Sequence, residues 1–203
     1  MPSVLTVGQA LISGLLLGGL YAILAIGLSL IWGMLKIINL AHFAFAFLAA
    51  YITYQVSNST GLDPFFTLVI TIPVFFLVGV GLQWFFETFD VSEFNSLLIT
   101  FGLFIIFQSL MTGIWTADYR SIDKTINPYN SQSFWIGEFA LPMSRFSAFL
   151  AAMVISGLTI YVLNRTYMGK ALRAISQDRD MAAAFGVNYR KMAMILSGAA
   201  TPA

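Results

Sequence analysis

Residues 168–191 read MGKALRAISQDRDMAAAFGVNYRK and form the one long stretch of this chain that is both charged and helix-forming. The stretch carries half of the chain's ten basic residues, namely Lys170, Arg173, Arg179, Arg190 and Lys191. Apolar, nearly uncharged sequence flanks it on both sides. This pattern is typical of a polar loop between two membrane spans. We therefore expect residues 165–191 to offer a helical surface to a partner in the cytoplasm.

The composition around this loop decides the fold class. Of 203 residues, 59% are hydrophobic and 9% are charged, whereas soluble domains carry about 25% charged residues. Uncharged windows cover residues 1–35, 37–62, 64–86, 94–117, 146–164 and 192–203. The first five are long enough for a membrane helix, which needs about 20 apolar residues. The sequence predicts an all-α, polytopic transmembrane helical bundle with five complete spans and a partial sixth.

The five complete spans are expected at residues 9–32, 35–57, 65–86, 94–115 and 145–163, within one transmembrane domain over residues 1–203. The last window, 192–203, begins like a span and stops after about half of one. We expect a chain truncated there, and a short interfacial helix is the alternative.

The orientation follows from the distribution of lysine and arginine. With the 165–191 loop and Lys36 on the cytoplasmic side, seven basic residues lie inside and three lie outside. This agrees with the excess of basic residues in cytoplasmic loops. The N-terminus is then predicted to lie outside. The loop at residues 87–93 is acidic, but acidic residues contribute little to this rule.

Polar residues within the predicted spans indicate where a solute could pass. Asn39 and His42 are three residues apart, so we expect them to share one helix face. Thr100, Gln108 and Thr112 should form a polar stripe on the fourth span. Polar groups inside a membrane usually face the bundle interior or a water-filled path. The alternative is that they only make hydrogen bonds between helices, which stabilise the bundle.

The sequence contains no recognisable catalytic set. HExxH, GxSxG and Walker-type motifs are missing, and His42, the single histidine, has no second histidine or cysteine to complete a metal site. We expect no enzymatic activity, no cofactor, no metal and no nucleic-acid partner. The spans also lack the charged residues that ion-coupled carriers often place there. Energy for uphill transport would therefore have to come from outside the membrane helices.

Two stretches carry a resemblance to a known family. The first is GGLYAILAIG at residues 18–27, followed by Gly33 and INLAH at residues 38–42. The second is MGKALRAISQD at residues 168–178, with AAAFGVN at residues 182–188. Together with LITFG at 98–102 and with Gln108, they make the chain similar to the permease family of branched-chain amino-acid ABC transporters. The likeness covers nearly the whole chain, as the N-terminal two-thirds of the family's domain.

The resemblance implies a multi-pass permease subunit of the bacterial inner membrane, surrounded by lipid, that imports branched-chain amino acids or a related small polar solute. It implies cytoplasmic ATP-binding subunits, a second permease subunit (in a homo- or heterodimer) and a periplasmic solute-binding protein. Asn39, His42, Thr100 and Gln108 become candidates for lining the path. An ATP-independent channel or facilitator for a small solute is the alternative, and a scaffold without transport activity is a third interpretation.

By the same resemblance, the 165–191 loop would be the coupling loop that docks on an ATPase, with Gly169, Arg173, Asp178, Ala182 and Gly186 as its key residues. We expect one helix over residues 170–185, ended by Gly186, with Asp178 close to an arginine or the partner and Ala182 on a smooth docking face. A solvated amphipathic loop is the alternative. Two departures stand out: Phe43 and Ala44 replace the family's usual residues after the histidine, and the 87–93 loop is acidic instead of basic.

Overall fold

A computed structural model of the chain describes residues 3–116, 118, 120–123, 125–130 and 132–201. Most of them are helical, as predicted. The helices are α1 (Val4–Leu35), α2 (Ala41–Thr60), α3 (Pro64–Thr88), α4 (Glu93–Trp115), α5 (Met143–Arg165), α6 (Tyr167–Gln177), α7 (Arg179–Ala184) and α8 (Tyr189–Ala200). A 3-10 turn, η1 (Pro128–Asn130), precedes a hairpin of β1 (Ser133–Ile136) and β2 (Phe139–Pro142).

Four of these helices, α1, α3, α4 and α5, are long and apolar enough to cross a membrane. The predicted total of five complete spans and a partial sixth is not confirmed by length and composition. Helix α2 covers most of the predicted second span but falls outside this group. Helix α8 covers most of the predicted partial span, whose last two residues, 202–203, lie outside the described residues.

The main departure within the helical part lies between α1 and α2. The second span was expected from residue 35, but α1 ends with Lys36 in the left-handed conformation (φ 57°) and α2 begins only at Ala41. Residues 36–40 form a non-helical link. Asn39 lies in this link and His42 lies in the first turn of α2, so the expectation that they share one helix face was wrong.

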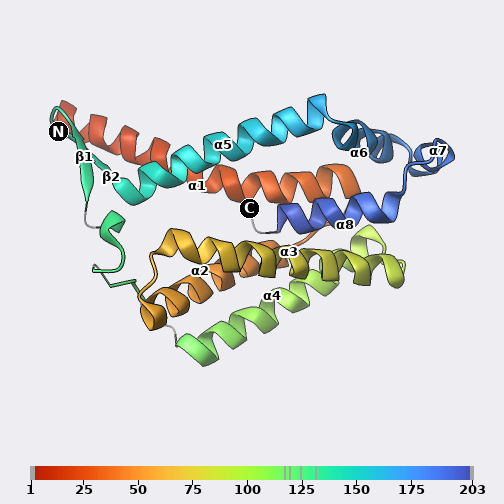
Figure 1. Ribbon diagram of the computed structural model, residues 1–203, viewed down its shortest axis with the longest axis horizontal. Coiled ribbons are helices and arrows are strands. Elements are labelled where there is room, and N and C mark those ends of the chain that lie inside the picture. Colours follow the sequence, from red (N-terminus) through yellow and green to blue (C-terminus); the bar gives the residue numbers. More distant parts are fainter. Residues whose placement is uncertain (1–2, 117, 119, 124, 131, 202–203) are drawn as a thin grey trace.

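The helices form two layers joined by α8 (Figure 1). Helices α1 and α5 pack together in one layer, α2, α3 and α4 form the other, and α8 contacts both α3 and α1. Glycines allow this close approach. A Cβ added at Gly79 of α3 would lie 2.5 Å from the carbonyl oxygen of Ser197, and one at Gly27 of α1 would lie 2.5 Å from that of Ala200. The short helix α8 therefore connects the layers.

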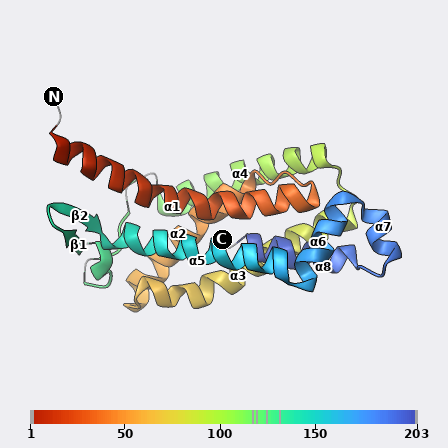
Figure 2. The same ribbon diagram turned by 90° about the horizontal axis from the view of Figure 1, so that it is seen from above.

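The loops gather at two opposite ends of the bundle (Figures 1 and 2). The start of α1, the α2–α3 turn and the hairpin lie at one end, whereas the α3–α4 turn, α6 and α7 lie at the other. At the first end, Gln9 accepts a hydrogen bond from the Ala140 amide at 3.0 Å and donates one to its carbonyl at 2.7 Å. These bonds hold the hairpin, which the all-α prediction missed, against α1.

Candidate functional site

The α1–α2 link runs along the buried side of α4 and is held there by two hydroxyl groups. The Ile38 amide donates to Ser96 Oγ at 3.2 Å, and the Leu40 amide donates to Thr100 Oγ1 at 3.1 Å. Thr100 Oγ1 also lies 3.1 Å from the Ile38 carbonyl oxygen and 2.8 Å from that of Ser96. At 1.5 Å per helical residue, Thr100 lies about 12 Å along α4 from its Ser92 cap. Non-helical backbone therefore enters the bundle, where side chains of α4 satisfy the Ile38 amide and carbonyl and the Leu40 amide.

Two side chains at this link are buried with a free polar atom. Asn39 is 1% exposed and His42 is 0% exposed, and within the described residues neither Asn39 Oδ1 nor His42 Nδ1 has a hydrogen-bond partner. His42 Nε2 lies 3.1 Å from the Leu24 carbonyl oxygen. The ring fills a notch at Gly27, where an added Cβ would lie 2.7 Å from His42 Cε1. Asn39 and His42 thus place buried polar atoms at a break between two helices. Such breaks form solute-binding sites in several transporter folds.

Gln108 does not belong to this group. Thr100 is fully buried against the link, whereas Gln108 and Thr112 are exposed on the outer face of α4. Residues advance about 100° each around a helix, so eight residues rotate Gln108 about 80° from Thr100. The expected single stripe is therefore split. With Ser109 and Gly113, Gln108 and Thr112 line a shallow hollow on the outer surface.

The link begins at a charged cleft of about 160 Å³. Its polar lining comes from the ends of α1 and α3, the α3–α4 turn, the start of α4, and α7 and α8, and consists of Lys36, Glu87, Asp90, Glu93, Arg179 and Tyr189. The sequence placed Lys36, the acidic loop and the 165–191 loop on one side of the membrane. The structure brings all three segments to one end of the bundle.

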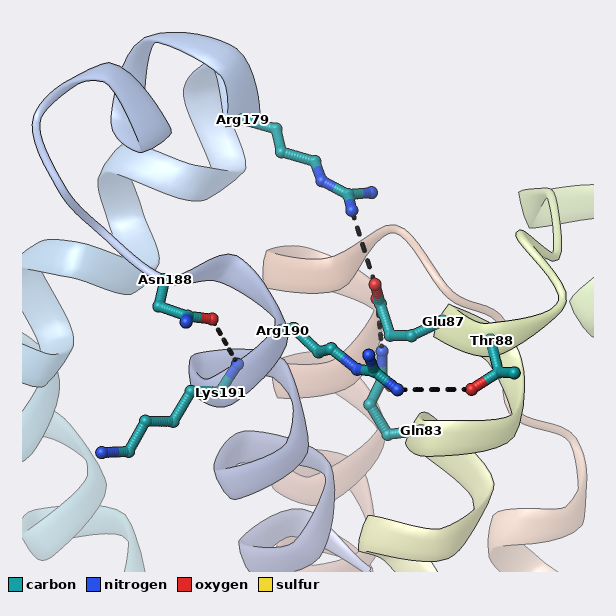
Figure 3. Close-up of polar contacts among 7 residues, drawn as sticks. All are labelled: Gln83, Glu87, Thr88, Arg179, Asn188, Arg190 and Lys191. Atoms are coloured by element: carbon teal, nitrogen blue, oxygen red, sulfur yellow. Dashed lines mark hydrogen bonds and ion pairs between the residues drawn. The ribbon is translucent and has the colours of Figure 1, made fainter.

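Glu87 is the central acceptor beside this cleft (Figure 3). Arg179 Nη2 donates to its Oε2 at 3.4 Å, forming an ion pair between α7 and α3, and Gln83 Nε2 donates to its Oε1 at 3.1 Å. Nearby, Arg190 Nη2 donates to Thr88 Oγ1 at 3.4 Å. Sequence reasoning missed this ion pair, although the acidic composition of residues 87–93 was its visible signal.

Tyr189 forms the aromatic wall of the same cleft. The guanidinium carbon of Arg179 lies 3.7 Å from the centre of its ring, which is a cation–π distance. Burial, together with the nearby Glu87 carboxylate, raises the pKa of Tyr189 to about 12, while Arg179 opposes the shift. The contact of Arg179 with this ring joins α7 to α8.

The loop between α5 and α8 folds back tightly on α5. Thr166 caps α6 by accepting from the Gly169 amide at 3.2 Å. Gly169 sits so close to the end of α5 that an added Cβ would collide with Leu163 and with the Val162 carbonyl. Arg173 Nη1 donates to Asn164 Oδ1 at 3.3 Å, which ties α6 back to α5. Glycine at position 169 and arginine at 173 thus set the position of α6.

The predicted helix over residues 170–185 is wrong, because it is interrupted at Asp178. This residue is extended (φ −153°), and its carboxylate accepts from the Met181 amide at 2.9 Å, so it caps α7. Of the two expected roles of Asp178, contact with an arginine or with the partner, no ion pair with an arginine occurs among the described residues. Ala182 is 4% exposed and faces inward, so it does not form the expected docking face.

Gly186 ends α7 as expected. Its φ of +81° is left-handed, its amide donates to the Ala183 carbonyl at 2.9 Å, and the Val187 amide donates to that of Ala182 at 3.1 Å. This pair of bonds is a Schellman cap. Met181 on α7 and Phe185 at its C-cap are 58% and 82% exposed. Such apolar side chains at the tip of a charged loop suit contact with a protein partner.

Comparisons with known proteins identify the family. The family model described as "Branched-chain amino acid transport system / permease component" matches residues 10–201. The high-affinity branched-chain amino acid transport system permease protein LivH of Salmonella typhimurium is 23% identical over 195 residues, and LivH of Escherichia coli K12 is 24% identical over 195. Each alignment covers 89% of this chain and 62% of the relative.

The permease protein BraD of the corresponding Pseudomonas aeruginosa system is 24% identical over 204 residues, covering 93% of this chain and 65% of BraD. The chain thus spans less than two-thirds of the length of these curated relatives. No solved structure matches it. Because the family model matches nearly the whole chain, the protein belongs to the permease component family of branched-chain amino acid transport systems.

Proposed function

We propose that the chain is a permease subunit of an ABC importer that moves branched-chain amino acids, or a related small polar solute, across the bacterial inner membrane. Cytoplasmic ATP-binding subunits would drive it, a periplasmic protein would deliver the solute, and a second permease subunit would complete the path. The observation that carries the proposal is the α6–α7 loop. Both helices are capped, and α7 presents exposed Met181 and Phe185 at the end of the bundle where the α1–α2 link begins.

The solute path is proposed to follow the link. Asn39, His42 and Thr100 gather at the helix break, and Asn39 and His42 each keep a buried polar atom without a partner among the described residues. Gln108 lies on the outer face of α4, so its part in the path requires the second permease subunit to cover that face. A lipid-facing carboxamide is costly, which supports such a covering.

The structure suggests how the ATPase would act on this path. Docking on α7 would displace Arg179, which is paired with Glu87 of α3. Arg179 and Glu87 line the same cleft as Lys36, the first residue of the link. A movement of α7 would therefore be passed to residues 36–40 and to Asn39.

We propose the topology that the sequence predicts. Five helices, α1 to α5, cross the membrane, α8 forms part of a sixth span, the N-terminus lies outside, and the 165–191 loop is cytoplasmic. The placement of the loops at two opposite ends of the bundle supports this arrangement (Figure 1).

The test is solute uptake into liposomes that contain the importer complex with its ATPase and binding protein. Gly186→Pro removes the amide that bonds to Ala183 and excludes the left-handed φ of this position. We expect ATP-dependent uptake to fall at least about tenfold, with normal membrane insertion. Gly186→Asn, which tolerates left-handed backbone, is the matched control.

Two results would contradict the proposal. Unchanged uptake by Gly186→Pro would remove the coupling role of the loop. Equal uptake by the unmodified complex with and without ATP would favour the facilitator.

A further inference from the structure

A second pocket, of about 260 Å³, lies at the end of the bundle that holds the α2–α3 turn and the hairpin (Figure 1). Its lining consists of Phe47, Ala50, Tyr51, Tyr54, Asp118 and Arg120. The four residues from α2 follow the spacing i, i+3, i+4 and i+7, so they form one face of that helix. Pockets for drug-sized ligands measure about 300–1,000 Å³. This pocket therefore suits a smaller solute.

The helical wall of the pocket is aromatic and is fixed against α4. The ring of Tyr51 stacks on that of Trp115, with 5.1 Å between the ring centres and 23° between the planes. Trp115 Nε1 also donates to Gln55 Oε1, one turn further along α2, at 3.2 Å. A tyrosine face attracts an ammonium group, whereas Phe47, which is 62% exposed, offers apolar surface.

The other wall carries two opposite charges on one hydroxyl group. Thr116 Oγ1 donates to Asp118 Oδ2 at 2.7 Å and accepts from Arg120 Nη2 at 3.2 Å. Arg120 Nη2 also donates to the Trp115 carbonyl oxygen at 3.1 Å. Neither Asp118 nor Arg120 forms an ion pair with a residue that the structure describes, and both are exposed. Each charge is therefore available to a ligand.

The backbone at Thr116 supports a role beyond a simple turn. Its φ of 64° and ψ of 177° define a conformation that is essentially confined to glycine. Such backbone conformations cluster at ligand-binding and catalytic sites. Here the conformation ends α4 and leads the chain to the two charged residues of the pocket.

We propose that this pocket binds a small zwitterion with an apolar side chain, namely an apolar α-amino acid. The ammonium group would lie between Asp118 and the Tyr51 ring, the carboxylate would accept from Arg120, and the side chain would cover Phe47. A simple cation or anion would leave one of the two charges without a partner. The amino-acid class rests on the proposed function. In the proposed topology this end faces outside, so the pocket would receive the solute before it enters the membrane.

The test measures binding of L-valine to the full chain, purified in a neutral detergent, by saturation-transfer NMR titration. Isobutylamine is valine without its carboxylate, and 3-methylbutanoate is valine without its ammonium group. We expect each analogue to bind about fivefold more weakly than valine, because it loses one contact with an exposed charge. Binding of either analogue as tightly as valine would overturn the zwitterion site.

Two variants locate the charges. Asp118→Asn should weaken valine binding about fivefold but should not weaken binding of 3-methylbutanoate, which has no ammonium group. Arg120→Gln should weaken valine binding equally and spare isobutylamine. A purely structural role would weaken all three ligands alike, which would overturn the proposal. The matched controls are Glu138→Gln and Arg145→Gln, since both residues are exposed at the same end and neither lines the pocket.

Circular dichroism and gel filtration must show unchanged folding for each variant. Among folded variants, valine binding that survives both Asp118→Asn and Arg120→Gln would overturn the site. The assay contains no ATPase, so its failure is distinct from failure of the importer. ATP-dependent uptake by a complex whose permease chain does not bind valine would overturn the pocket alone, whereas valine binding without ATP-dependent uptake would overturn the importer alone.

Discussion

Thr100 holds the helix break with a single hydroxyl, which accepts from the Leu40 amide and faces the Ile38 carbonyl. Thr100→Val keeps the shape of the side chain but leaves these buried backbone groups without their partner. We expect a loss of about 1–3 kcal/mol in the free energy of unfolding. Thr100→Ser, which keeps the hydroxyl, should lose clearly less. Chemical unfolding in detergent measures both, and equal losses would show that Thr100 contributes only packing.

Tyr189 should make stability depend on alkaline pH. Its pKa is raised from 10.0 to about 12 in the folded chain, so the folded state holds the phenolic proton more tightly than the unfolded state does. The stabilisation is complete below pH 10 and is lost as pH rises through about 12. Phenylalanine has no phenolic proton to lose. The unfolding midpoint of Tyr189→Phe should therefore fall less between pH 10 and pH 12 than that of the unmodified protein. The unfolding midpoints of the two proteins are measured at pH 9 and at steps up to pH 12. Midpoints that fall in parallel with pH would contradict the raised pKa.

At the residue scale, the sequence predicts which side chains are unusual but not how they meet. Asn39, His42 and Thr100 stand out because they are polar within apolar windows. The break at residues 36–40 is invisible locally, since this stretch contains neither glycine nor proline. It depends on Ser96 and Thr100, about sixty positions away in the chain. Gln108 was misplaced because a spacing of eight only approximates one helix face.

At the element scale, the close crossing of α3 and α8 depends on a few glycines. A Cβ at Gly79 would lie 2.5 Å from the Ser197 carbonyl oxygen, and one at Gly198 would lie 2.8 Å from Val80 Cγ2. Ser197 Oγ also donates to the Gly79 carbonyl at 3.1 Å. These contacts make α8 an integral part of the bundle. Its sequence predicts a membrane segment, but the glycine contacts appear only when both helices are placed.

Gly79→Ala should separate packing from helix propensity. Alanine favours a helix interior over glycine by up to about 1 kcal/mol, but here its Cβ would push against the α8 backbone, at a cost of about 1–3 kcal/mol. We expect a net loss of stability. Gly81→Ala, in the same helix with no atom within 4 Å of the added Cβ, should be neutral or stabilising. Thermal unfolding of the two variants decides, and an equal response would rule out a tight crossing.

The 165–191 loop was likewise predictable only where its structure depends on neighbouring residues. The Gly186 cap was predictable because a left-handed residue after a helix is usually glycine. The interruption at Asp178 was missed, although aspartate is a common N-cap, because the flanking sequence is helix-forming on both sides. The partner of Arg179 was also missed, since Glu87 lies near the end of α3, 92 positions away in the chain.

At the scale of the whole molecule, the two layers and the grouping of loops at opposite ends determine how many times the chain crosses the membrane. Helices α1, α3, α4 and α5 have the length and composition of spans, and α2 decides whether the number is four or five. Residues 36–40 and α2 together connect the end of α1 to the opposite end of the bundle, where Gln55 of α2 accepts from Trp115 Nε1 at 3.2 Å. This arrangement favours a crossing by α2.

Labelling of single cysteines tests that crossing directly, because the chain has no cysteine of its own. If α2 crosses, Val4→Cys, Ser59→Cys and Glu138→Cys should react with a membrane-impermeant maleimide from outside intact cells. Asp90→Cys and Asp180→Cys should react only after the membrane is opened. If α2 did not cross, Val4 and Ser59 would lie on opposite sides, because α1 alone would separate them. Labelling of Val4→Cys together with Asp90→Cys would therefore contradict five crossings, and labelling of Asp180→Cys but not of Val4→Cys from outside would reverse the proposed orientation.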